Sequence, residues 1–102
     1  MSELEKLEKA RRKMLRYRLL RTLQIGYPRP VGEGLIAQVV VDADLAATHE
    51  QIRAALTYLA DSQFIELHVA GEFWEGRLLP KGVNFLEDES LMDPGIARPA
   101  SR

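Results

Sequence analysis

A short stretch near the middle of the chain carries polar side chains that could hydrogen-bond to DNA bases. They are Thr48, His49, Gln51, Arg53 and Thr57. Arginine can bind the edge of guanine through two hydrogen bonds, and glutamine can bind adenine in the same way. If a helix presents this stretch to a major groove, Arg53 and Gln51 are the side chains that distinguish bases. The alternative is an ordinary solvated helix face, on which Glu50 and Asp61 would repel phosphate.

Positive charge is concentrated in the first quarter of the chain. Residues 1–25 carry eight Lys or Arg and three Glu, whereas the remaining 77 residues carry six Lys or Arg and twelve Asp or Glu. Arg12 and Arg16 are four residues apart, so on a helix they share one side and could follow a phosphate backbone. The other interpretation is an ordinary helix whose charged face is exposed to solvent and binds nothing.

Arg77 is a further candidate for a phosphate contact, in the second half of a predicted hairpin. Glu72 and Glu75 lie close to it in the sequence and oppose that role. An acidic hairpin could instead face a protein or solvent. The neighbouring aromatic residues, Phe73 and Trp74, are expected to pack under the sheet.

The residue types argue against catalysis and against a metal site. Cysteine is absent, which excludes disulfides, thiol nucleophiles and cysteine-rich zinc sites. The two histidines, His49 and His68, fall on different predicted elements. No glycine-rich phosphate loop, nucleophile elbow or carboxylate pair with a histidine within reach is evident. We therefore expect a non-enzymatic protein that needs no cofactor or metal.

The first element that must position these side chains is a helix over residues 4–25, which contain no Gly or Pro. Its second half places apolar side chains on one face, at Leu15, Leu19, Leu20 and Leu23. Its first half is poorer in apolar residues: Leu4, Leu7 and Met14 stand near heptad spacing, and Arg11 interrupts them. We expect this half to project from the core or to pair with another subunit.

Two shorter helices are predicted next. Glycine and proline in residues 26–32 end the first helix. Apolar spacing then predicts a helix over 33–41, although three consecutive valines also suit a strand. Thr48 and Gln51 form a capping-box signature, and a third helix is predicted over 49–63 with Ile52, Leu56 and Leu59 inward.

A β-hairpin follows, with strands over 64–69 and 73–79 joined by a turn at Gly71 and Glu72. Gly76 inside the second strand suggests a bulge or a later turn. A short closing helix or turn is expected after Pro80. Residues 1–89 would then form one domain, and residues 90–102 a flexible tail.

Three helices followed by a hairpin wing and a short closing helix or turn define an α+β winged helix-turn-helix fold. Residues 56–65 resemble the end of a winged-helix recognition helix entering its wing, and residues 78–86 resemble the usual Leu-Thr-Pro-Lys-Gly exit. Leu79 stands where that pattern has Thr, which weakens the expected helix cap. Together with residues 95–99, the chain resembles the small ArsR-like winged-helix proteins of Mu-like phages and prophages. The resemblance implies a gene of the head and packaging region.

Two functions follow as expectations. The first is a phage or prophage transcription regulator that binds double-stranded DNA. The alternative is a protein-interaction module in head assembly or DNA packaging, without sequence-specific DNA binding. A homodimer through the N-terminal helix is expected in either case. The N-terminus is charged from Glu3 and no apolar run approaches membrane length, so we expect a cytoplasmic location in a bacterial host.

Overall fold

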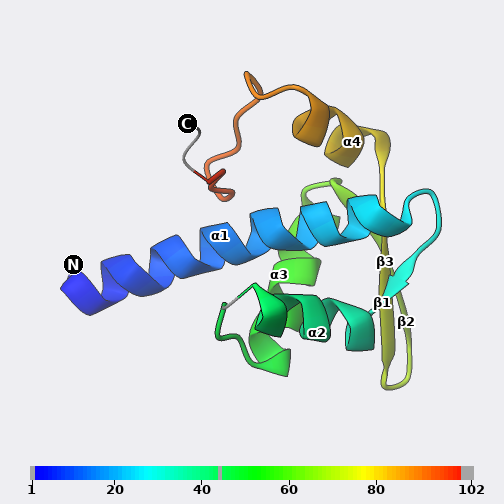
Figure 1. Cartoon of the computed structure of the whole chain (residues 1–102), viewed down its shortest axis with the longest axis horizontal. Helices are drawn as coiled ribbons and strands as arrows, with labels where there is room; N and C mark the ends of the chain where they lie inside the picture. Colours follow the sequence, from blue (N-terminus) through cyan, green and yellow to red (C-terminus); the bar gives the residue numbers. More distant parts are fainter. Residues whose placement is uncertain (1, 44, 100–102) are drawn as a thin grey trace.

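The computed structural model describes residues 2–43 and 45–99. Within them, four helices and a three-stranded antiparallel sheet make an α+β domain. In chain order the elements are α1 (Glu3–Gly26), β1 (Val31–Gly32), α2 (Glu33–Asp42), α3 (His49–Asp61), β2 (Ile65–Ala70), β3 (Phe73–Leu78) and α4 (Pro80–Glu87) (Figure 1). Each predicted helix and strand is present with slightly different ends, and β1 is additional.

The sheet has the order β1-β3-β2. Gly71 has φ +61° in the two-residue turn between β2 and β3, a conformation that glycine adopts without strain. Gly76 is neither a bulge nor part of a turn, because it pairs with Val31 on one side and Leu67 on the other. A Cβ atom at Gly76 would lie 3.3 Å from Leu23 Cδ1, so a side chain here would require Leu23 of α1 to shift by a few tenths of an ångström.

The residues at the N-terminal ends of α1, α3 and α4 determine how each helix is capped. The predicted capping box of Thr48 and Gln51 is confirmed at the start of α3, and a second box, formed by Ser2 and Glu5, starts α1. The N-cap of α4 is Leu79, which makes no side-chain capping bond. The weak cap predicted at that position is therefore confirmed, and Pro80 in the first turn supplies the helical φ instead.

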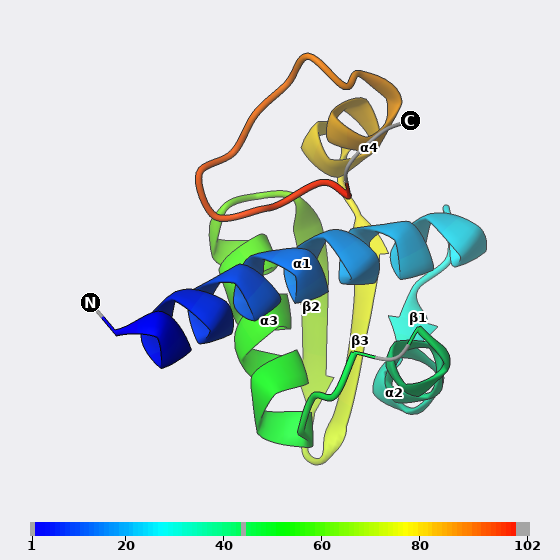
Figure 2. The same ribbon diagram turned by 60° about the vertical axis from the view of Figure 1, so that its left-hand side comes forward.

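The core lies where the second half of α1 crosses the sheet beside α3 (Figure 2). Leu19, Leu20 and Leu23 of α1 are fully buried, together with Leu56 and Leu59 of α3. The first half of α1 extends beyond the other elements (Figure 1). In the described part of the chain no helix combines the length and apolarity needed to cross a membrane.

The segment after α4 is packed, which differs from the predicted flexible tail. Ile96 is only 6% exposed, and the Ala97 amide donates to the Lys13 carbonyl of α1 at 3.2 Å. One Arg98 guanidinium nitrogen donates to three backbone carbonyls, those of Phe85, Asp88 and Leu91. Proline and glycine indicate irregular backbone, and irregular backbone can still be fixed by such contacts. Residues 100–102 of the predicted tail lie outside the described residues.

Two glycines provide a matched test of the packing. A Cβ atom at Gly82 would lie 2.3 Å from the Phe64 carbonyl oxygen, whereas nothing lies within 4 Å of a Cβ at Gly34. We expect Gly82→Ala to lower the free energy of unfolding by about 2 kcal/mol through overpacking. Gly34→Ala should raise it by about 0.5 kcal/mol, because alanine loses less backbone entropy in a helix. Urea denaturation measures both, and equal effects would contradict the described packing.

Truncation of Ile96 tests whether the tail is held in solution. We expect Ile96→Ala to lower the free energy of unfolding by about 2 kcal/mol, because a buried side chain is lost. Met92→Ala is the control, since Met92 is 83% exposed, and it should change stability by less than about 0.5 kcal/mol. A thermal melt of Ile96→Ala that coincides with wild type would mean that the tail is loose.

Candidate functional site

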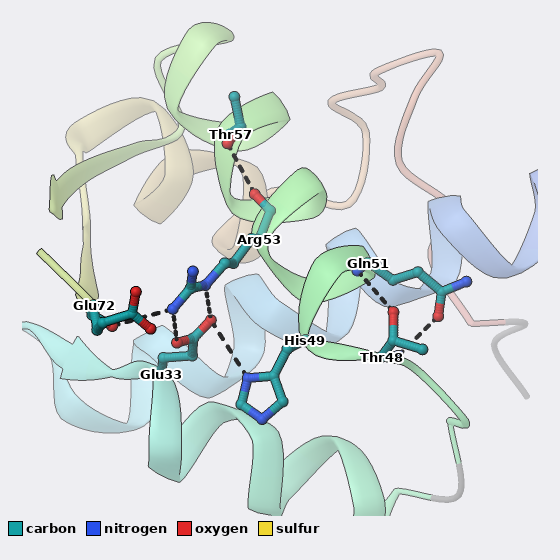
Figure 3. Close-up of polar contacts among 7 residues, drawn as sticks. All are labelled: Glu33, Thr48, His49, Gln51, Arg53, Thr57 and Glu72. Carbon is teal, nitrogen blue, oxygen red and sulfur yellow. Dashed lines mark hydrogen bonds and ion pairs between the residues drawn. The ribbon is translucent and has the colours of Figure 1, made fainter.

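Two of the five predicted base-reading side chains cap their own helix. Thr48 Oγ1 accepts a hydrogen bond from the backbone N–H of Gln51 at 3.1 Å. Gln51 Oε1 accepts one from the backbone N–H of Thr48 at 2.8 Å (Figure 3). Both residues are exposed at the start of α3. Their oxygen atoms are therefore already engaged in stabilising the helix end.

Thr57 and His49 are also exposed, one on each side of Arg53. The Thr57 hydroxyl donates to the Arg53 carbonyl at 2.8 Å, a contact within the helix. His49 Nδ1 lies 3.7 Å from a carboxylate oxygen of Glu33, and the His49 side chain is 71% exposed. His49 is thus largely open to solvent despite its approach to Glu33.

Arg53 is held on three sides. Its Nε donates to Glu33 Oε2 at 2.6 Å and its Nη2 to Glu33 Oε1 at 2.8 Å. The same Nη2 donates to the Glu72 carbonyl at 3.1 Å, in the turn between β2 and β3 (Figure 3). Its guanidinium lies 4.8 Å from the centre of the Trp74 ring. Arg53 therefore ties α3 to the first residue of α2 and to the hairpin.

Glu33 is the residue of this site that sequence reasoning missed. Its side chain is buried, and the hydrogen bonds from Arg53 lower the pKa of its carboxyl, against the opposing effect of burial and with help from His49. The hydrogen bonds to Glu33 in turn raise the pKa of Arg53. The sequence signal at Glu33 was only an acidic residue at a helix start, which the helix dipole alone explains.

The other predicted arginines are distributed over the molecule. Arg16 Nη1 donates to the Gly95 carbonyl at 2.9 Å and its guanidinium stacks 3.8 Å from the centre of the Tyr58 ring. Burial is the main cause that lowers the pKa of Arg16. Arg77 pairs with Glu66 at 3.1 Å. Of the four predicted arginines, Arg12, Arg16, Arg53 and Arg77, only Arg12 is exposed without an ion pair or hydrogen bond among the described residues.

The exposed surface of α3 and the hairpin is acidic. Its carboxylates are Glu50, Asp61, Glu66, Glu72 and the half-buried Glu75. Val69 and Phe73 add apolar surface near the hairpin turn, with exposed fractions of 48% and 54%. Phe73 therefore does not pack under the sheet as predicted, whereas Trp74 packs partly against the core.

Among residues 2–43 and 45–99, no three His, Asp or Glu side chains lie close enough together to hold a metal ion. Comparison of the chain with known protein families, curated proteins and solved structures gave no match. What the site offers chemically is a set of exposed carboxylates, an apolar hairpin tip and one internal ion pair.

The Glu33 ion pair should be visible in the pH dependence of stability. Because the pKa of Glu33 is lowered from 4.5 in the folded state, its contribution is present above that pH and is lost as the pH falls through the folded-state pKa. We expect Glu33→Gln to be less stable than wild type at pH 7, and the gap to close on acidification. Urea denaturation at several pH values measures it, with the exposed Glu87→Gln as control. Parallel curves for Glu33→Gln and wild type would contradict the pairing.

Proposed function

We propose that the chain is a winged-helix domain that binds a protein partner through α3 and the β2-β3 hairpin, without reading DNA sequence. The order of three helices and a hairpin supports the fold, with α3 in the position of the recognition helix and the hairpin as the wing. The phage setting implied by the sequence resemblance makes head assembly or DNA packaging the proposed context.

The state of Arg53 carries this proposal. It is the only Lys or Arg in α3, and two of its three guanidinium nitrogens, Nε and Nη2, already donate to Glu33 and to the Glu72 carbonyl. A two-bond contact to guanine would have to compete with these bonds. Breaking these bonds would leave the Glu33 carboxylate buried without its partner, which is costly. A recognition helix without a free cation lacks the commonest specific contact to DNA.

The surface around Arg53 also suits a protein better than a phosphate backbone. Carboxylates on α3 and the hairpin repel phosphate, and Arg77 is neutralised by Glu66. Val69 and Phe73 supply exposed apolar area of the kind that forms the centre of protein interfaces. The expected partner surface is therefore apolar at its centre and basic around it.

DNA binding is the second candidate, and the basic charge of α1 favours it. Lys6, Lys9, Arg11 and Arg12 are exposed on the half of α1 that extends beyond the core. Such a surface would bind phosphates of any sequence, with strong salt dependence. In this candidate role the chain is a transcription regulator or packaging factor whose specificity comes from elsewhere.

A crosslinking experiment tests the protein-binding proposal. A photo-crosslinking phenylalanine analogue replaces Phe73 in cells that express the chain from its own locus. We expect one major protein adduct, which is lost when Glu72→Lys and Glu75→Lys are added because a basic partner surface is then repelled. The same analogue at Glu87, which is exposed on α4, is the control.

Fluorescence anisotropy with a short labelled duplex completes the test. We expect no saturable binding at low salt up to about 100 µM protein, where non-specific DNA-binding proteins saturate. Saturable binding whose salt slope falls by about 0.9 in Arg12→Ala would establish the second candidate instead. An adduct at position 73 no stronger than at position 87 would also overturn the protein-binding proposal.

A further inference from the structure

A groove runs between the first half of α1 and the loop that joins α2 to α3. It encloses about 600 Å³, and a second hollow of about 420 Å³ continues it to Val41. Apolar side chains, among them Leu15, Ala47 and Ala54, line the groove. Arg11 and Arg12 stand along its α1 side, and neither makes an ion pair within the described residues. Glu8 and Arg16 also line it, so the groove combines apolar surface with three arginines and one glutamate, a net positive charge.

The same half of α1 carries apolar side chains that its own core does not use. Leu4, Leu7 and Met14 are 64%, 52% and 47% exposed. With Arg11 they occupy alternate spacings of three and four residues, which places them along one side of the helix. This is the pattern of a helix that pairs with another helix, and within residues 2–43 and 45–99 no other helix lies beside the N-terminal end of α1 (Figure 1).

Charge along α1 is polarised. Residues 1–8 carry three glutamates and one lysine, whereas residues 9–16 carry five Lys or Arg and no acidic residue. Two such helices side by side in parallel would place like charges opposite each other. Antiparallel pairing places the acidic end of each helix opposite the basic part of the other, which is attractive at both ends.

We propose that two copies of the chain associate through antiparallel α1 helices, and that the acidic first turns of each copy lie against the basic groove of the other. The heptad spacing aligns Leu4 of one copy with Met14 of the second, and Leu7 with Arg11, with the two-fold axis near Lys9. A single polar residue in such a seam fixes the register. The contact is self-complementary and closes as a dimer.

The rest of the fold leaves this contact accessible. The tail after α4 joins α1 at Lys13 and Arg16, and Figures 1 and 2 place it on the side of α1 away from the α2-α3 loop. The proposed dimer surface also lies apart from Phe73 and the hairpin. The inference therefore does not depend on the proposed function, and the crosslinking experiment at Phe73 can succeed or fail without it.

Charge reversal on the full-length chain tests the dimer by sedimentation velocity at low and high salt. Wild type should sediment as a dimer, and Glu3→Lys with Glu8→Lys should raise the dissociation constant at least tenfold. Adding Arg11→Glu and Arg12→Glu to that variant lowers the net charge of residues 9–16 from +5 to +1. Association should be partly restored, because most of the repulsion is removed and the introduced lysines can pair with the introduced glutamates. Glu5 is left unchanged because it closes the capping box. Glu87→Lys with Glu89→Lys, both exposed, is the matched control and should behave as wild type.

Three outcomes would overturn the proposal. The first is a wild-type monomer at high micromolar concentration. The second is a dimer that Glu3→Lys with Glu8→Lys leaves unchanged, as a parallel pair would, since like charges then oppose each other before and after reversal. The third is a fourfold variant that stays monomeric although circular dichroism shows that it is folded. Restored association in the fourfold variant separates loss of the interface from damage to the helix end.

Discussion

The ion pair between Glu33 and Arg53 joins three parts of the molecule that local sequence would leave independent. Glu33 begins α2, Arg53 lies in α3, and the third contact is the backbone of the hairpin turn at Glu72. A buried carboxylate requires a partner, so the position of Arg53 is fixed by the needs of the fold. The one arginine of α3 is therefore already paired at the surface of this helix.

Because the arginines of α3 and the hairpin are paired, the exposed face of these elements carries net negative charge. Arg53 and Arg77 are both paired with glutamates, so they do not offset the remaining carboxylates. A cluster of exposed positive charge, Lys6, Lys9, Arg11 and Arg12, lies instead on the first half of α1, beyond the core. The domain thus has two surfaces of opposite character, which suit different partners.

The helices and the hairpin could be predicted because their signals are local. Apolar spacing and the Thr48 capping box identify α1 and α3, and turn residues identify the hairpin. The two residues of β1 are too few to show a pattern, and their pairing with β3 depends on chain far away in the sequence. The same holds for Glu33, whose partner is 20 residues distant, and for Arg16, which binds a carbonyl 79 residues away. Sequence spacing identified candidate arginines but could not show which were already engaged.

The contacts of the tail make the two ends of the chain mechanically dependent on each other. The Gly95 carbonyl and the Ala97 amide bind α1 at Arg16 and Lys13, at the boundary between its core-packed half and its projecting half. They brace α1 at that boundary, in addition to the packing of its second half in the core. A substitution in the segment after α4 can therefore act on the projecting half of α1, about 80 residues away in the sequence.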